Sequence, residues 1–161
     1  MNNNAVRVLV SFAVPLLAGA LGSLATRPAI TGWYATLNKP PFNPPGWLFG
    51  PAWTVLYILM GLAAYLVWSR GLAAPGVKPA LALFVVQMFL NVLWSFLFFA
   101  ARSPLAGFVE IVALWAAILV TMVLFFRVSP AAGWLMVPYI GWVSFAAVLN
   151  GAIMLLNRKG A

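Results

Sequence analysis

The stretch WYATLNKPPFNPPGW, residues 33–47, is the one long part of this chain that cannot form a membrane helix. Four prolines within residues 40–45 remove backbone donors and fix φ, so we expect no regular helix through it. The stretch is also rich in Trp, Tyr, Phe and Asn, which a plain spacer does not require. We interpret it as a rigid aromatic connection and as a candidate lid over a binding cavity.

Apolar stretches surround this segment, and each reaches the roughly 20 residues that a bilayer-crossing helix needs. They cover residues 5–26, 47–68, 79–100, 105–126 and 133–156. The breaks between them pair a charge with a helix breaker, as in Arg27-Pro28 and Arg102-Ser103-Pro104. We therefore predict an all-α integral membrane protein, a single domain formed by a compact bundle of five transmembrane helices with a structured loop between helices 1 and 2.

The first stretch has a second interpretation, as a secretory signal, because Arg7 precedes an apolar run that contains Ala18-Gly19-Ala20. The apolar run continues to about Ala25, which favours a retained helix.

Composition limits the chemistry of the chain. It has 161 residues, of which 65% are hydrophobic and 6% charged, whereas a soluble domain carries about 25% charged residues. There is no His, no Cys and one acidic residue, Glu110, so we expect no metal site, no intrinsic cofactor and no conventional acid–base or nucleophilic catalysis. An enzymatic role is therefore not our first expectation.

The net charge of +8 comes from nine Lys and Arg residues scattered singly, almost all between or beyond the apolar stretches. This pattern favours contact with anionic lipid headgroups, not with nucleic acid. The alternative is that one or two of these residues pair with a carboxylate of a ligand.

Polar and aromatic residues share faces of three predicted helices. Gln87, Asn91 and Trp94 lie at i, i+4 and i+7, and Trp53 and Tyr57 lie at i and i+4. The last span has a similar face, formed by Tyr139, Trp142, Ala146, Leu149 and Asn150. Two interpretations remain open: a pocket for a flat hydrophobic ligand, or polar contacts that only hold the helices together.

Five motifs occur in order along these spans. They are WYxxLxKPxxxPP (33–45), GPxWxxLY (50–57), QxxxNxxW (87–94), FFxAR (98–102) and PYxxWxxxAxxLN (138–150). Together they resemble the translocator protein family, also called tryptophan-rich sensory proteins or peripheral benzodiazepine receptors, and the resemblance covers roughly residues 15–157.

The resemblance implies a five-helix bundle, commonly a homodimer, with a cavity under the loop between helices 1 and 2. Family members bind porphyrins, haem and isoquinoline- or benzodiazepine-like compounds, and mitochondrial members bind cholesterol. With the shared faces above included, the expected ligand-binding residues are Ser23, Tyr34, Phe49, Gly50, Ala52, Trp53, Tyr57, Gln87, Asn91, Trp94, Val109, Ala113, Trp142, Ala146 and Leu149. We expect Lys39 or Arg27 to meet the carboxylates of a bound porphyrin.

Two departures from the family pattern matter for the ligand. Residues 148–158 contain no Tyr, which the sterol-recognition pattern requires, and Ala106 stands where some members place a Trp. These departures argue against high-affinity cholesterol binding. We expect a protein of the bacterial cell envelope, in preference to the mitochondrial outer membrane, that binds tetrapyrroles and has a role in sensing, transport or regulation. The alternatives are light-dependent porphyrin degradation through Trp53 and Trp142, and lipid or sterol transport.

Overall fold

The computed structural model describes residues 3–158, and this range contains helices and connecting segments without a strand. The elements follow in the order α1 (Asn3–Thr31), α2 (Trp33–Thr36), α3 (Gly46–Trp68), α4 (Val77–Ser95), the π-helical turn η1 (Phe96–Ala100), α5 (Pro104–Val128) and α6 (Pro130–Leu156). Five of the helices in this range, with η1 continuing α4, are long and apolar enough to cross a membrane. The prediction of an all-α protein with five spans is confirmed.

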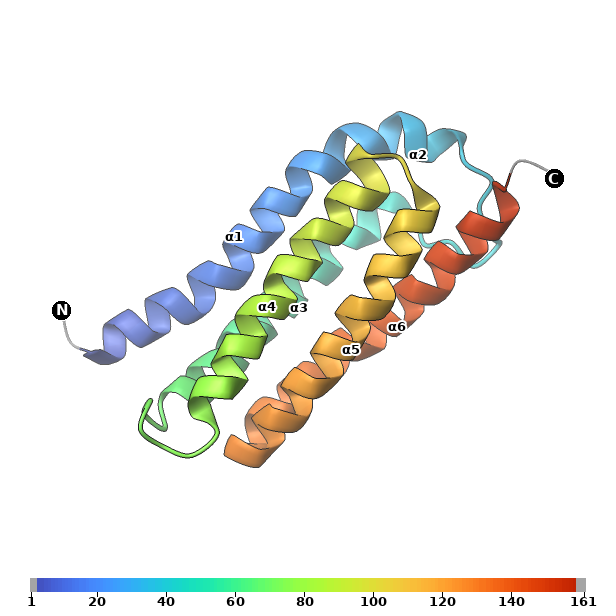
Figure 1. Cartoon of the computed structure of the whole chain (residues 1–161). Coiled ribbons are helices and arrows are strands. Elements are labelled where there is room, and N and C mark those ends of the chain that lie inside the picture. The colour runs from blue at the N-terminus through green and yellow to red at the C-terminus, as the bar shows by residue number, and fades with distance from the viewer. Residues whose placement is uncertain (1–2, 159–161) are drawn as a thin grey trace.

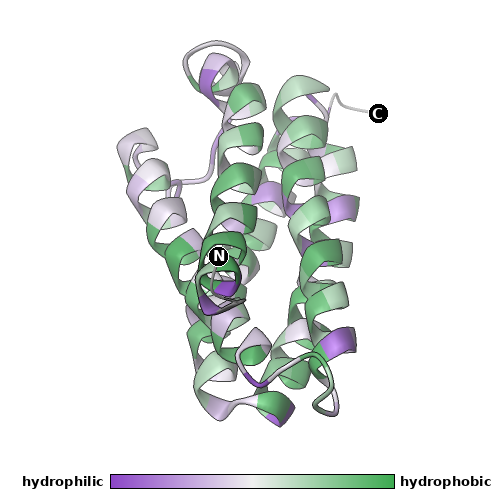
Figure 2. Cartoon of the chain, turned by 90° about the vertical axis from the view of Figure 1, so that its left-hand side faces the viewer, coloured by the Kyte–Doolittle hydropathy of each residue, from purple (hydrophilic) through white to green (hydrophobic). Residues whose placement is uncertain are grey.

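The five long helices pack side by side, and neighbours meet in the cyclic order α1, α3, α6, α5, α4. Figure 1 shows that the N-terminal end of α1 and the C-terminal end of α6 lie at opposite ends of the bundle. Hydrophobic residues dominate the lengths of the helices in Figure 2, where hydrophilic residues are sparse and gather mainly toward the ends. This distribution is the one that a bilayer selects.

Serine followed by proline starts the last two long helices. The Ser103 Oγ accepts a hydrogen bond from the Ala106 amide at 3.2 Å, and the Ser129 Oγ accepts one from the Ala132 amide at 3.4 Å. The proline at the first helical position lacks only a donor that would have no helical partner there. Because of its cap, α6 begins three residues before the predicted start at residue 133.

The predicted end of the first helix at Arg27-Pro28 is wrong. α1 continues through Pro28 to Thr31, and Gly32 separates it from the single turn α2. A proline inside a helix removes one backbone donor but does not prevent the following residues from continuing the spiral. No regular helix runs through residues 33–47. The single turn α2 covers Trp33–Thr36, α3 starts at Gly46, and the proline-rich part between them is not helical.

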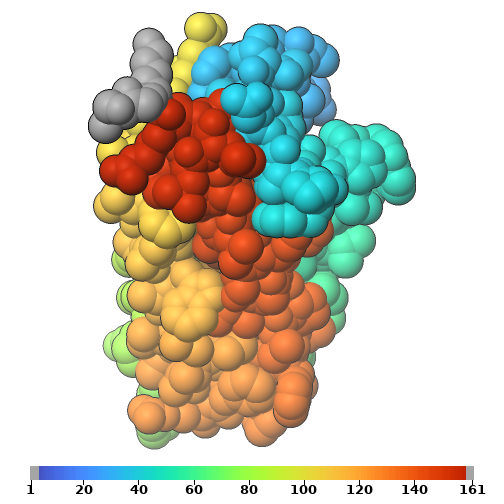
Figure 3. Space-filling view, turned by 90° about the vertical axis from the view of Figure 1, so that its right-hand side faces the viewer, coloured from blue at the N-terminus to red at the C-terminus, as the bar shows by residue number. Residues whose placement is uncertain are grey.

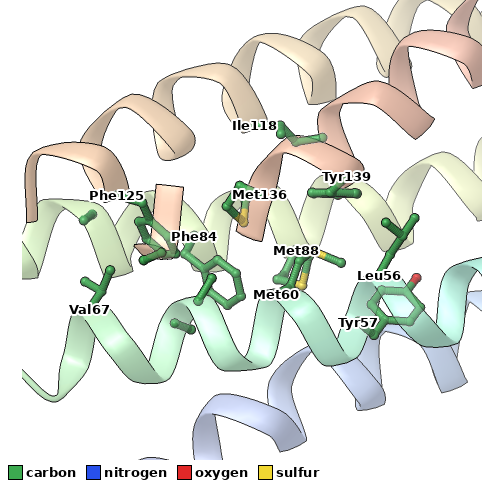
Figure 4. Packing of buried hydrophobic residues seen from close by; sticks show 14 of the residues in the cluster. Leu56, Tyr57, Met60, Val67, Phe84, Met88, Ile118, Phe125, Met136 and Tyr139 are labelled. Atoms are coloured by element: carbon green, nitrogen blue, oxygen red, sulfur yellow. The ribbon is translucent and has the colours of Figure 1, made fainter. Parts of the chain in front are cut away.

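Interlocked apolar side chains fill the middle of the bundle and the end that lies away from the 33–45 segment. Figure 4 shows Met60, Phe84, Met88 and Met136 meeting between α3, α4 and α6, and all four are at most 3% exposed. The rings of Phe84 and Phe125 stack at a centroid distance of 5.7 Å. This packing leaves the free space at the other end, below the 33–45 segment.

Candidate functional site

A cavity of about 530 Å³ lies at that end of the bundle, between α1, α3, α6 and the end of α4. This volume falls in the range of about 300–1,000 Å³ that is usual for small-molecule sites. Ten of the fifteen expected ligand-binding residues line it, together with Arg27. The ten are Ser23, Tyr34, Phe49, Gly50, Trp53, Tyr57, Trp94, Trp142, Ala146 and Leu149.

The floor of the cavity depends on a glycine of α1. A Cβ at Gly19 would overlap the ring of Tyr57, so only glycine lets α1 close onto this side chain. Three residues later, a Cβ at Gly22 would lie 3.0 Å from the Ser95 Oγ, so α1 also approaches α4 closely. These two close approaches hold α1 against α3 and α4 on this side of the cavity.

The α1 and α3 walls have hydroxyl groups that are already occupied. Ser23, Thr26 and Thr54 each donate to a carbonyl of their own helix, at 2.7, 3.0 and 2.9 Å. A ligand therefore meets mainly the apolar side of these residues. Arg27 is the cationic residue that reaches the lining, and no acidic side chain is among the lining residues.

The opposite wall is a cluster of aromatic rings set by η1. Trp94 and Phe98 stack at 5.3 Å, and Phe98 and Phe99 meet edge to face at 4.8 Å. In an α-helix two consecutive residues point about 100° apart, whereas the wider π turn brings both Phe98 and Phe99 to the interior. The sequence contained these residues in the FFxAR motif, but a 3.6-residue period gave no signal that both face a cavity.

The third wall comes from α3 and α6. Trp53 stacks on Tyr57 at 5.4 Å, and Trp142 meets Phe49 edge to face at 6.2 Å. Ala146 and Leu149 continue the α6 wall toward the roof. Flat aromatic faces with small aliphatic neighbours suit a broad planar ligand, because such rings stack at little conformational cost.

Tyr34 of α2 forms the roof and is 8% exposed. Its hydroxyl donates to the Asn43 Oδ1 at 2.7 Å, and the Asn43 side-chain amide donates to the Pro44 carbonyl at 3.1 Å. Burial raises the pKa of Tyr34 to about 12, so the phenol stays protonated and keeps its donor at neutral pH.

Lys39 lies on the outer side of this roof. Its ammonium group is 5.0 Å from the centroid of the Tyr34 ring and donates to the carbonyls of Ala35 and Leu37 at 3.2 and 3.0 Å. Lys39 does not line the cavity, and of the two cations expected near ligand carboxylates only Arg27 does.

A pair of hydrogen bonds ties the roof segment to Asn157, the residue that follows the last turn of α6. The Asn38 amide donates to the Asn157 Oδ1 at 3.0 Å, and the Asn157 side-chain amide donates back to the Asn38 carbonyl at 2.9 Å. Phe42 and Phe145 add a ring contact at 6.5 Å. Figure 3 shows the C-terminal part of α6, in red, against the cyan segment that precedes α3.

Gln87 and Asn91 do not line the cavity; they form a buried chain of hydrogen bonds under its floor. Tyr57 donates to the Asn91 Oδ1 at 2.8 Å, the Asn91 side-chain amide donates to the Tyr139 hydroxyl at 3.0 Å, and Tyr139 donates to the Gln87 Oε1 at 3.0 Å. The shared helical face was predicted correctly, but for these two residues it serves contacts between helices.

The other expected site residues lie elsewhere. Val109 is 64% exposed and Ala113 is also exposed, both on the outer face of α5, so neither lines this cavity. Ala52 lines a separate groove between α3 and α6. The family motifs match this chain in residue type and position. They do not show which way a side chain points, because that depends on how each helix is rotated in the bundle.

Comparison with known proteins gives one consistent result. A family model described as the TspO/MBR family matches residues 11–156. The "Tryptophan-rich protein TspO" of Chlorobaculum tepidum is 45% identical over 157 residues, which covers 98% of this chain and 99% of that protein. The "Translocator protein" of Ovis aries is 40% identical over 139 residues, with 85% and 82% covered. The "Tryptophan-rich sensory protein" of Cereibacter sphaeroides is 39% identical over 137 residues, with 81% and 84% covered.

Proposed function

Since the chain belongs to the TspO/MBR family, we propose that it is a multi-pass membrane protein that binds flat hydrophobic tetrapyrroles, such as porphyrin or haem, in the cavity under the 33–45 segment. The observation that supports this most is the lining of the cavity, where Trp53, Trp94 and Trp142 supply ring faces and Arg27 supplies a positive charge. Isoquinoline- and benzodiazepine-like compounds share the flat apolar shape and are proposed as further ligands of the same cavity.

Both parts of a porphyrin have a match in this proposal. The apolar macrocycle would stack on the tryptophans, and each stacked pair contributes about 0.5–1.5 kcal/mol beyond area burial. The propionate groups would extend toward Arg27. A carboxylate among apolar rings loses its hydration, and without a cation nothing offsets that free-energy cost. Lys39 does not line the cavity, so Arg27 is the proposed partner of the propionates.

The test is a titration of the purified protein in detergent with protoporphyrin IX, followed by quenching of tryptophan fluorescence. Arg27→Gln should weaken binding by about tenfold, the range of one charge-assisted hydrogen bond. The matched control is Arg70→Gln, which changes an exposed arginine just beyond the far end of α3. Protoporphyrin dimethyl ester should bind the wild type and the Arg27→Gln variant equally. Unchanged protoporphyrin affinity in a Trp53→Ala/Trp142→Ala variant would contradict the stacked arrangement.

The cellular role that we propose is sensing, transport or regulation in tetrapyrrole handling, in the envelope of a bacterial cell and as a homodimer. The names of the relatives, sensory protein and translocator protein, motivate this choice. Lipid or sterol transport is the alternative. A proteoliposome assay separates the roles, since a transporter accelerates porphyrin flux above empty vesicles whereas a sensor leaves it unchanged.

A second candidate function is light-dependent degradation of bound porphyrin, with molecular oxygen as the oxidant. The observation that favours it is the contact of Trp53 with Tyr57 and Tyr139, at ring distances of 5.4 and 6.2 Å, beside the cavity. Trp142 lines the same cavity from α6. Illumination of the complex should bleach the porphyrin band faster than in Trp53→Phe and Trp142→Phe variants, and equal rates would exclude this function.

A further inference from the structure

A groove of about 660 Å³ on the outside of the bundle lies between α3 and α6. Its lining has only apolar side chains and glycine, and Pro51, Val55 and Gly141 at its edges are exposed. Both helices are long and apolar enough to cross a membrane. In that setting the groove opens toward hydrocarbon, where a polar occupant would lose its hydration.

The groove has a direction. It starts at Pro44, in the segment between α2 and α3, and runs along α3 from Leu48 to Leu56. With a rise of 1.5 Å per residue, this part of α3 is about 12 Å long. The groove therefore begins near the end of the bundle and continues into its apolar middle, which suits a chain-shaped occupant with a polar end.

Positive residues occur at the end of the bundle where the groove starts, although they do not line it. Lys39 and Arg158 directly follow Asn38 and Asn157, the two residues that are hydrogen-bonded to each other at this end. Two donors of the Lys39 ammonium bond to carbonyls, and the third remains available. The one acidic residue of the chain, Glu110, lies on α5, which does not line the groove.

We propose that this groove binds one acyl chain of an anionic phospholipid, whose phosphate lies against Lys39 and Arg158. The combination of an apolar trough with a cationic end matches an amphiphile with a negative head. A sterol lacks the negative charge, and a second copy of the chain would bring the same positive charge to this end.

The groove and the cavity share one wall. Trp142 lines both, and its ring contacts Phe49 of the cavity at 6.2 Å and Phe145 of the groove at 5.8 Å. An acyl chain in the groove therefore packs on the side of Trp142 that faces away from the cavity. This link to the cavity rests on the proposed tetrapyrrole site. A lipid in the groove holds Trp142 in the position in which it stacks on the porphyrin, and so strengthens porphyrin binding.

The lipid site is tested without porphyrin, by native mass spectrometry of the detergent-solubilised protein titrated with phosphatidylglycerol or phosphatidylcholine. The main variant is Gly141→Leu, because a Cβ at this position meets no atom within 4 Å and the longer side chain occupies the groove. Gly141→Ala leaves most of the groove open, and Val148→Leu changes an exposed α6 residue outside it. Gly141→Leu should weaken phosphatidylglycerol binding by about tenfold through lost apolar contact. Gly141→Ala and Val148→Leu should retain it, and wild type should prefer phosphatidylglycerol to phosphatidylcholine.

Equal phosphatidylglycerol affinity in wild type and Gly141→Leu would overturn the proposal. A change of oligomeric state in Gly141→Leu with lipid binding intact would also overturn it and assign the groove to a second copy of the chain. Displacement of phosphatidylglycerol by a sterol at the same site would assign it to sterols. For the link to the cavity, added phosphatidylglycerol should raise protoporphyrin affinity severalfold in wild type and not in Gly141→Leu. If no protoporphyrin binds at all, the proposed function fails while the lipid result still stands.

Discussion

The Tyr34 hydroxyl donates to the Asn43 Oδ1 at 2.7 Å across nine residues of chain, and this bond closes the proline-rich segment on itself above the cavity. The donor is on the helical turn α2, and the acceptor closes a backbone turn in the segment that leads to α3, where the Asn43 amide donates to the Pro40 carbonyl at 3.0 Å. The shape of the roof therefore depends on a side-chain contact in addition to the fixed φ angles of its prolines.

Replacing Tyr34 by Phe removes this bond and keeps the ring. We expect protoporphyrin to dissociate about fivefold faster, since a neutral hydrogen bond contributes about 1 kcal/mol. Stopped-flow recovery of tryptophan fluorescence measures this rate. The control is Tyr65→Phe, which removes a hydroxyl bonded to Asn4, a residue near the start of α1. Equal acceleration by both variants would show that the effect is not specific to the roof.

The same phenol predicts a pH dependence of stability. Because burial raises the pKa of Tyr34 from 10 to about 12, the folded protein favours the protonated form. The contribution of the protonated Tyr34 to the free energy of unfolding is complete below pH 10 and is lost as the pH rises from 10 to about 12. The difference in melting temperature between wild type and Tyr34→Phe should be constant from about pH 7 to 9 and should then shift against wild type. A difference that does not change up to pH 12 would contradict the assigned burial.

Asn157 should control how often the roof opens. Asn157→Ala removes both hydrogen bonds to Asn38, worth about 0.5–1.5 kcal/mol each at most. Hydrogen exchange of the Asn38 amide should accelerate, while exchange in the middle of α3 should not change. Asn157→Asp keeps an acceptor for the Asn38 amide but loses the donor, so we expect an intermediate rate. An Ala variant that exchanges as slowly as wild type would mean that the pair does not hold the segment.

Two glycines that line the cavity should respond oppositely to alanine. Gly19→Ala should destabilise the protein by about 1–3 kcal/mol, because the added Cβ overlaps the Tyr57 ring. Gly50→Ala should stabilise it by up to about 1 kcal/mol, because its Cβ meets no atom and alanine favours the helix. Thermal unfolding in detergent measures both. Equal effects would show that α1 does not pack on Tyr57 as described.

Much of the fold could be predicted from the sequence because the bilayer imposes a simple rule on apolar length. The five spans follow from it, whereas the end of α1 does not, since Pro28 resembles a helix breaker and is tolerated inside the helix. Phe98 and Phe99 were missed as cavity residues because a π turn leaves no periodic trace in one sequence.

The candidate site was predicted less completely, for a physical reason. A helical face that carries amides and aromatic rings looks the same whether it meets a ligand or another helix. Trp94 lines the cavity, while Asn91, less than one turn away, is used by Tyr57 and Tyr139. Which partner a polar side chain meets depends on the neighbouring helices, and their rotation is set by contacts such as Gly19 with Tyr57.

The Asn38–Asn157 pair also has a topographical consequence. It places the roof on the same side of the membrane as the C-terminal end of α6, and the start of α1 on the other side. Protease accessibility of the C-terminal residues in sealed vesicles would therefore report which compartment the roof faces. A single orientation measurement, made without any ligand, would identify the aqueous compartment from which a water-borne molecule first reaches this protein.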